Sequence, residues 1–296
     1  MRKKIIRVTL NLADGTKTFT AQGDNRLQST GLAISTNITY GNGAISPTAQ
    51  ITIYGLPMSS MAPLFRVQWN TMSAILNTVK IEVGEQGGEL TKAYEGNITF
   101  ATISMNAAPN VGLVITSQMA VVEKMKATPP FTIPKGEEVD AAEIISFLAK
   151  DMGYQFENNG ASHIITDTSL NGSNLEKIEK LASMCDFDLY VEQGLIVICK
   201  KGTARPVKIP IVTPKNRTLN GYPEPDQRGI SFNCLYDPMI KFGGIITIKD
   251  SLIEIANADW RIYGLVSTLE ANIPQGKWHC SVNATWRDSK DAAVQR

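Results

Sequence analysis

Apolar and polar residues alternate over most of the first 120 residues, which is the pattern of half-buried β-strands. In the first such segment Ile6, Val8 and Leu10 share one face, and Arg7 and Thr9 share the other. One short helix is expected at residues 58–65, and strands are expected at residues 5–12, 16–21, 32–40, 49–54, 79–83, 97–105 and 111–119. Six or seven strands with so little helix indicate a β-barrel or a β-sandwich.

A helical period replaces this alternation between residues 135 and 200. Apolar residues recur every three or four positions from Ala141 to Met152, preceded by acidic residues that the N-terminal end of a helix dipole favours. Ser173 and Glu176 match the capping box, which opens a second helix at residues 174–185. With short strands at residues 154–157, 163–167, 187–192 and 195–199, the order αββαββ predicts a small α/β sandwich. The stretch 128–134, with three prolines, is predicted to be a linker.

The β pattern returns in the last third of the chain. It predicts an exposed loop rich in Asn, Pro and Gly at residues 214–227 and strands at residues 207–212, 229–234, 244–249, 260–269 and 276–285. The expected fold is therefore mainly β with an α+β insert. Its three domains are an N-terminal β domain at residues 1–128, a small α/β domain (the α/β module) at 129–202, and a C-terminal β domain at 203–296.

Charge separates the same three parts of the chain. Residues 1–134 carry 11 basic and 7 acidic side chains, residues 135–200 carry 5 and 12, and residues 201–296 carry 13 and 9. The net charge of +1 therefore hides an acidic insert between two basic flanks. An isoelectric point near 7.6 argues against tight binding of nucleic acid, which needs clustered Lys and Arg.

The cysteines and the apolar runs indicate in which compartment the protein folds and whether it enters a membrane. Cys185, Cys199, Cys234 and Cys280 are widely spaced and form no C-x-x-C pair, so we expect no zinc site and expect reduced, buried thiols in a protein that folds in the cytoplasm. The alternating N-terminus lacks the continuous apolar core of a signal peptide, and no apolar run reaches the length of a membrane span. We expect no membrane insertion.

Candidate catalytic groups are few. Asp186 and Asp188 would project from one face of a strand, as in some metal sites, but acids at a strand edge after a helix are expected to lie in solvent. His163 has no Ser or Cys constellation near it, and His279 and Cys280 are strand neighbours that point to opposite faces. No phosphate-binding glycine motif is present in the sequence. We therefore predict no catalytic, cofactor-binding or metal-binding residue, and no cofactor.

Three tryptophans in the C-terminal part have two readings. Trp260, Trp278 and Trp286 would form a stacking platform for bases or sugars if they were exposed together. Their strand spacing is more typical of β core or of contacts between subunits.

Several segments of the two β-rich parts form a recognisable pattern. In the N-terminal part they are residues 48–56 (TAQITIYGL), the apolar helix that follows, and residues 79–83 and 94–98. In the C-terminal part they are residues 237–243 (DPMIKFG), 260–265 (WRIYGL) and 272–278 (NIPQGKW). In these segments the chain resembles the baseplate hub proteins of contractile-tailed phages. The helices at 141–152 and 174–185 resemble those of the small domain between the two halves of a hub, and also those of secretin N-domains. The resemblance spans nearly the whole chain.

The resemblance implies two tail-tube-like β-barrel domains that flank the α/β module, in a homotrimer whose barrel halves imitate a six-fold tail tube. Such a protein is a structural component of the virion's tail baseplate, assembled in the host cytoplasm. Its partners would be the tail tube protein, the central spike protein, the tape-measure protein and the baseplate wedge proteins, with DNA only in transit. We expect no enzymatic activity, because the sequence shows no counterpart of a lysozyme-like or other hydrolase extension.

Two other classes of function stay open on the residues alone. A β-rich carbohydrate-binding or adhesin-like module would use the tryptophans, and a hydrolase would be centred on Asp186 and Asp188 or on His163.

Overall fold

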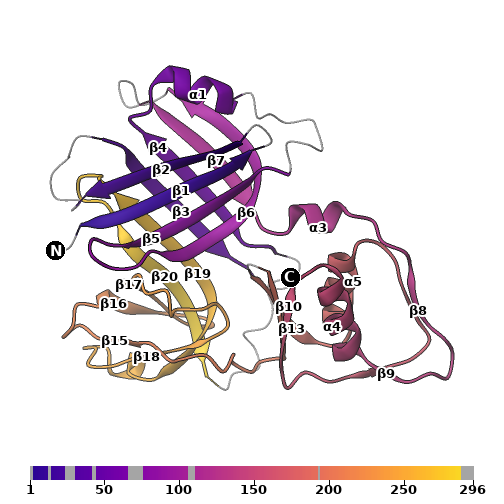
Figure 1. The fold of residues 1–296 in the computed structure, drawn as a ribbon. Helices are drawn as coiled ribbons and strands as arrows, with labels where there is room; N and C mark the ends of the chain where they lie inside the picture. Colours follow the sequence, from indigo (N-terminus) through magenta and orange to yellow (C-terminus); the bar gives the residue numbers. More distant parts are fainter. Residues whose placement is uncertain are drawn as a thin grey trace. The chain divides into compact units, whose positions relative to one another are not determined.

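The fold is mainly β, with a few helices (Figure 1). The computed structural model describes residues 3–12, 15–23, 31–41, 45–65, 76–105, 111–192 and 194–287. The sequence also indicates turns at residues 14–15, 41–43 and 193–194 and a loop at 108–110, and these segments lie wholly or partly outside the described residues.

The chain divides into two compact units, each built from segments that are distant in sequence. Unit 1 comprises Met1–Thr39, Pro47–Val121 and Val266–Cys280. Unit 2 comprises Tyr40–Ser46, Val122–Leu265 and Ser281–Arg296. The last third of the sequence therefore contributes to both units.

Unit 1 contains the strands that the alternating N-terminal pattern predicted. Ile6, Val8 and Leu10 are at most 1% exposed, and burying an aliphatic side chain of this size contributes about 1.5–3 kcal/mol. Its elements are β1 (Lys4–Leu12), β2 (Gly15–Gly23), β3 (Ala33–Tyr40), β4 (Thr48–Tyr54), α1 (Met58–Phe65), β5 (Thr78–Glu85), β6 (Thr91–Ser104) and β7 (Gly112–Gln118). All the strands predicted here and the short helix are confirmed, and β6 begins earlier than expected.

Two long C-terminal strands complete this sheet. They are β19 (Asp259–Ala271) and β20 (Trp278–Trp286), and β19 lies beside β3. In unit 1 the Thr36 hydroxyl donates to the Leu269 carbonyl at 3.1 Å, and the Ser35 hydroxyl donates to Glu270 at 3.1 Å. Strands from the two ends of the chain therefore share one sheet (Figure 1).

The hydrogen-bonded order of this largely antiparallel sheet is β16-β17-β20-β19-β3-β4-β7-β6-β5-β1-β2, with β18 and β15 attached beside β19. Among the described residues the path has two ends, β2 and β16, and no closed barrel is present.

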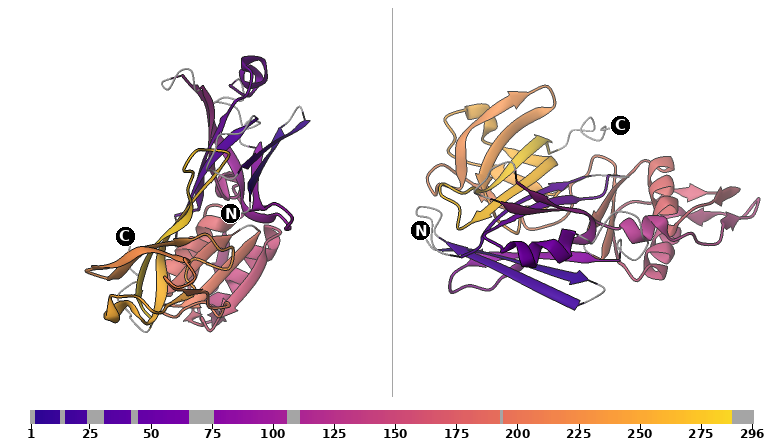
Figure 2. Two further views of the ribbon diagram at one scale, coloured as in Figure 1. Left: turned by 90° about the vertical axis from the view of Figure 1, so that its left-hand side faces the viewer. Right: turned by 90° about the horizontal axis from the view of Figure 1, so that it is seen from above.

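Unit 2 contains the α/β module, in which two helices lie together beside a three-stranded sheet of order β10-β14-β13 (Figure 2). Asp140 caps the first helix by accepting from the Ala142 N–H, and Ser173 and Glu176 form the predicted capping box of the second. This sheet is mixed, because β14 pairs with β10 in parallel and with β13 in an antiparallel way. Its elements are β9 (Val139–Asp140), α4 (Ala141–Asp151), β10 (Gln155–Asn159), β11 (Ile164–Ile165), β12 (Thr168–Leu170), α5 (Asn174–Met184), β13 (Phe187–Glu192) and β14 (Leu195–Lys200).

The prediction of a linker at residues 128–134 is wrong in part. After α3 (Val121–Met125) it contains β8 (Phe131–Ile133), which pairs with β12. Lys177 of α5 fixes the segment, because its ammonium donates to the Thr128 hydroxyl at 2.8 Å and the Pro129 carbonyl at 2.6 Å. The prediction for residues 163–167 was also too long, since only Ile164–Ile165 is a strand, and it pairs with β9 outside the main sheet of the module.

The C-terminal β segments of unit 2 differ from prediction in two places. The expected strand at residues 207–212 is reduced to β15 (Ile211–Val212), and the expected loop at 214–227 contains β16 (Leu219–Asp226). β16 holds Pro223 and Pro225, which a strand tolerates at the edge of a sheet, where the missing N–H would face solvent. The other elements are β17 (Gly229–Leu235), β18 (Ile245–Ile248) and the short 3-10 helix η1 (Glu254–Ala256).

All four cysteines are buried and unbridged, as the sequence predicts. Within the described residues, none of the helices has both the length and the hydropathy that a membrane crossing requires.

Candidate functional site

Two buried arginines organise the contact between the α/β module and the C-terminal β segments of unit 2. Arg205 follows β14 in the chain, and its side chain is only 3% exposed. Its guanidinium lies 2.5 Å from a Glu192 carboxylate oxygen and 3.9 Å from one of Glu157. It also lies over the Tyr190 ring, with the guanidinium carbon 5.7 Å from the ring centroid.

The second arginine is Arg261, on β19. Its Nη1 lies 3.5 Å from Oδ2 of Asp188, and both side chains are at most 5% exposed. The Gly202 N–H donates to the same carboxylate oxygen at 3.0 Å. The prediction that Asp188 is solvated is therefore wrong. Its side chain is buried, and the guanidinium of Arg261, from a distant part of the chain, compensates its charge.

Aromatic packing surrounds these ion pairs. The Tyr190 and Phe242 rings meet edge-on, with centroids 5.6 Å apart. Gly243 has φ +76°, and a Cβ at that position would lie 2.5 Å from the Tyr190 ring, so the backbone approaches the ring closely. Burial, followed by the charge of Asp188, raises the pKa of the Tyr190 phenol well above its usual range, and the ring stays neutral.

This charged contact is a structural site. Its carboxylates are paired with guanidinium groups or hydrogen-bonded to the backbone, so their oxygens are already engaged by groups of the same chain. Removing one partner of such a buried pair typically costs about 3–5 kcal/mol. The arrangement fixes the α/β module on the C-terminal β segments of the same unit.

The structure does not bring Asp186 into this contact. Asp186 lies in the turn before β13 with φ +58°, and its exposed carboxylate pairs with Lys201. Across the described part of the chain, no group of three or more His, Cys, Asp and Glu side chains is placed to hold a metal ion.

The two histidines occupy separate positions. His163 is exposed, and its backbone N–H donates to Asp140 at 3.2 Å, which places it in the loop that supports α4. Cys280 is buried against Ser267, whereas His279 on the same strand is partly exposed. Burial, and next the charge of Lys277, lower the pKa of His279.

The tryptophans divide between two places. Trp278 lies in unit 1, with the Lys4 ammonium 5.0 Å from its ring. Trp260 and Trp286 stack on each other in unit 2, with centroids 4.5 Å apart and planes inclined by 30°. Trp260 is buried and donates from Nε1 to the Ala256 carbonyl at 2.8 Å, while Trp286 is 49% exposed.

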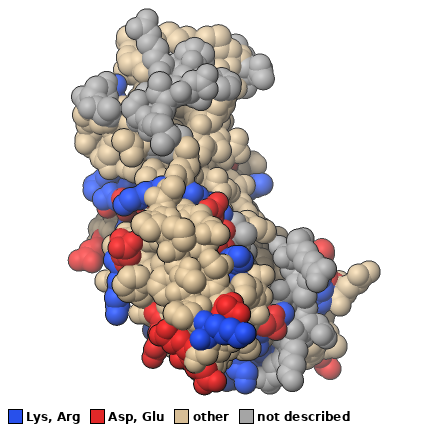
Figure 3. Space-filling model, turned by 90° about the vertical axis from the view of Figure 1, so that its right-hand side faces the viewer, with Lys and Arg blue, Asp and Glu red and all other residues tan. Residues whose placement is uncertain are grey.

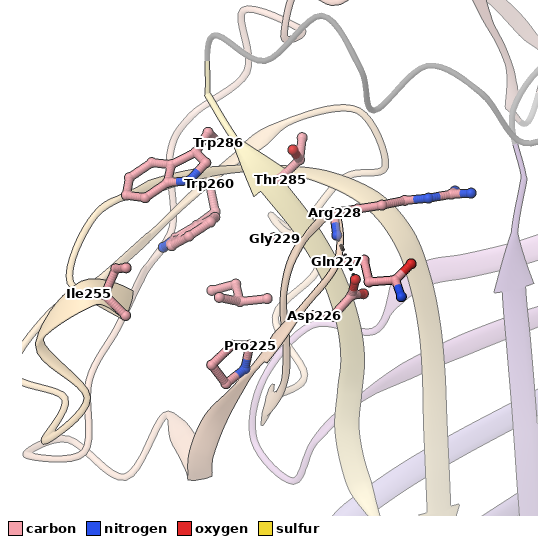
Figure 4. Close-up of a pocket in the computed structure, with 10 residues that line it drawn as sticks. Pro225, Asp226, Gln227, Arg228, Gly229, Ile255, Trp260, Thr285 and Trp286 are labelled. Atoms are coloured by element: carbon pink, nitrogen blue, oxygen red, sulfur yellow. Dashed lines mark hydrogen bonds between the residues drawn. The ribbon is translucent and has the colours of Figure 1, made fainter.

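The Trp260–Trp286 stack lines a pocket of about 400 Å³ at the end of the β16–β17 hairpin (Figure 4). Asp226 in the hairpin accepts from the Arg228 N–H at 2.7 Å and from the Tyr263 hydroxyl at 3.0 Å, and these hydrogen bonds, in that order, lower the pKa of its carboxyl. The pocket therefore combines one exposed indole with a fixed carboxylate.

Sequence reasoning missed Arg205 and Arg261. Each pairs with residues of a different structural element, and no local spacing reveals such a pairing.

On the face shown in Figure 3, acidic and basic side chains lie next to one another over the lower part of the view.

Solved structures of tail proteins share the fold. Prophage MuSo2 43 kDa tail protein from Shewanella oneidensis is 10% identical, with a TM-score of 0.60 over 98% of this chain and 99% of that one. A tail protein from Neisseria meningitidis MC58 is 9% identical, with a TM-score of 0.57 over 97% and 99%. The E. coli protein c3393, a component of the type VI secretion system described as similar to T4 phage tail proteins gp27 and gp5, is 9% identical, with a TM-score of 0.57 over 89% and 75%. No curated protein matches the sequence.

The fold is thus that of phage tail proteins and their relatives. At the level of sequence, the profile of the family described as Baseplate hub gp41 matches residues 5–272. The chain belongs to this family of structural phage tail baseplate proteins, as the resemblance in its sequence predicted.

Proposed function

We propose that the chain is a non-enzymatic hub of a contractile tail, in a phage or a phage-derived particle, and that it forms a trimeric ring with pseudo-six-fold symmetry. The observation that supports this most directly is the sharing of one large sheet by strands from the two ends of the chain. In the ring, residues 1–128 and 203–296 are the two tube-like halves of each copy, and residues 129–202 form the α/β domain between them. The tube-like barrels close only in the assembled ring.

The ring joins the tail tube to the central spike and leaves an axial channel. It contacts the tape-measure protein and the baseplate wedge proteins, and DNA passes through it in transit. A net charge of +1 suits such a passage, because dense contacts with phosphate would retain the DNA.

The two ends of the sheet differ in a way that bears on ring formation. β16 carries Pro223 and Pro225, which lack N–H groups, so its edge is protected against a further strand. β2 has no proline over nine residues. Since Leu12 and Gly15 are the last pair of the β1–β2 hairpin, the even-numbered residues of β2 direct their N–H groups away from β1. We assign the β2 edge to the contact between copies.

Mass photometry of the purified chain tests the ring. A trimer that dissociates on dilution is expected, and averaged electron micrographs should show a three-fold ring with an open axis. Thr18→Pro removes an outward N–H of β2 and should leave folded monomers, whereas Thr18→Ala keeps the N–H and should leave the trimer intact. A persistent wild-type monomer at micromolar concentration would rule out the ring.

A carbohydrate-binding module is the second candidate, favoured by the exposed Trp286 and the neighbouring Asp226 carboxylate. Sugars bind through a ring face stacked on an indole and hydroxyl groups bonded to carboxylates. A glycan array probed with the wild type and with Trp286→Ala tests this function. The wild type should bind a glycan and the variant should lose that binding; a wild type that binds no glycan would rule the module out.

A further inference from the structure

A groove runs along the exposed face of α4 in the α/β module. It has a volume of about 550 Å³, and one wall is the helix, with Glu143, Ser146, Phe147 and Lys150. The other wall is β10, with Phe156 and Asn158. Neither the ion pairs of Arg205 and Arg261 nor the tryptophan stack involves the residues of this groove.

The β10 wall is an open strand edge. Among the described strands of its sheet, β10 pairs only with β14, in parallel, and the Gln155 N–H donates to the Gly194 carbonyl at 2.7 Å. Backbone polar groups of successive strand residues point to alternate sides, so those of residues 155, 157 and 159 face β14. The backbone groups of Phe156 and Asn158 therefore face the open side, and these same two residues line the groove.

The helix wall supplies apolar surface at this edge. Phe147 is 59% exposed, and its ring lies beside that of Phe131, with centroids 6.2 Å apart and planes inclined by 42°. Burial of an exposed phenyl ring against a partner is favourable. A side chain from a strand added to β10 would cover it.

The charge of the α/β module and of the groove determines which extended segments can bind there. Residues 135–200 carry 12 acidic and 5 basic side chains, and two acidic residues, Asp140 and Glu143, line the groove together with one basic residue, Lys150. Hydrogen bonds from Ser162, Ala142 and His163 outweigh desolvation and lower the pKa of Asp140, which keeps this carboxyl ionised. A segment that carries Lys or Arg is therefore favoured over an acidic one.

We propose that this groove binds an extended, basic segment of another polypeptide, which adds a strand to the open edge of β10 and places an apolar side chain against Phe147. Strand addition between an edge strand and a helix is an established mode of peptide recognition, with backbone hydrogen bonds for affinity and alternate side chains for specificity. The proposal does not depend on the hub ring, since every residue that it uses lies in unit 2.

A random peptide library displayed against the full-length chain tests the groove. Enriched peptides should alternate apolar residues with Lys or Arg. Phe147→Asp should weaken their binding at least about tenfold, and Glu143→Lys should weaken the basic ones selectively. Met184→Asp is the matched control, because Met184 is 51% exposed on α5 of the same module and lies outside the groove.

N-methylated forms of the best peptide distinguish strand addition from side-chain docking. Methyl groups on the alternate nitrogens that face β10 should abolish binding, and the complementary set should leave it unchanged. No enrichment, enrichment of acidic peptides, or equal binding by wild type and Phe147→Asp would overturn the proposal. Mass photometry of the same variants keeps the two questions separate, because Phe147→Asp should remain a trimer if the hub ring is correct.

Discussion

Arg261 on β19 and Asp188 on β13 form an ion pair that is almost completely removed from water, with 3.5 Å between Nη1 and Oδ2 and side chains 4% and 5% exposed. Together with the pairing of Arg205 to Glu192, this contact connects the α/β module to the C-terminal β segments of unit 2. Loss of either partner would leave an uncompensated charge in the interior of the unit.

Asp188→Ala should destabilise the protein by about 3–5 kcal/mol, because it removes the carboxylate that faces the buried Arg261 guanidinium. Urea denaturation followed by circular dichroism measures the change. Asp186→Asn is the control: it keeps a side chain that tolerates the positive φ of +58°, and it removes only an exposed carboxylate that pairs with Lys201, so the expected loss is below about 1 kcal/mol. Equal effects of the two substitutions would contradict a buried structural pair.

Gly243→Ala should cost several times more stability than Gly136→Ala. Both residues have positive φ, +76° and +88°, and share a backbone penalty of roughly 1 kcal/mol. Only at Gly243 would the new Cβ meet the Tyr190 ring, at 2.5 Å, which adds about 1–3 kcal/mol of overpacking. Thermal unfolding of both variants gives the difference, and similar melting temperatures would show that the ring moves freely.

Lys177→Met should release the segment at residues 128–134, which contains β8. The variant keeps the buried aliphatic stem but leaves the Pro129 carbonyl without its charged donor, a loss of about 1.5–3 kcal/mol. Hydrogen exchange of the β8 amides should accelerate, while exchange in β1 stays constant. Lys180→Met, at an exposed position on the same helix, should leave β8 protection at its wild-type level.

Stability should fall below about pH 6.5, the usual pKa of a histidine, in part through His279. Burial lowers the pKa of His279 in the folded state, so the unfolded chain binds the proton more readily below the unfolded value, and acid favours unfolding. His279→Gln should reduce the slope of stability against pH between pH 5 and 6.5. Identical slopes for wild type and His279→Gln would contradict the assignment.

Local signals in the sequence located most elements of the fold. The strands of unit 1 follow from their alternation, and the capping box of Ser173 and Glu176 located the start of α5. β16 was predicted to be a loop because Pro223, Pro225 and nearby glycines are typical of loops. The segment is a strand because it pairs with β17 at the edge of the sheet, and the sequence does not show this pairing. Arg261, which forms the ion pair with Asp188, lies 73 residues further along the chain, and Pro129 lies 48 residues before Lys177. At such separations the spacing of residues carries no signal. The aspartate was recognised as a candidate, but its burial depends on tertiary packing that periodicity does not encode.

The place of β19 beside β3 has a consequence for synthesis on the ribosome. Thr36 and Leu269, which are hydrogen-bonded in the finished sheet, are 233 positions apart, so β3 emerges long before its neighbour exists. A nascent chain therefore carries an open strand edge until β19 has been synthesised, and non-native pairing is most damaging during this time. Unit 1 completes its sheet only after the codons for β19 have been read, and a product truncated before that point keeps the edge exposed to chaperones and proteases of the cell. Completion of the N-terminal sheet thus requires a residue that is synthesised 233 positions after Thr36.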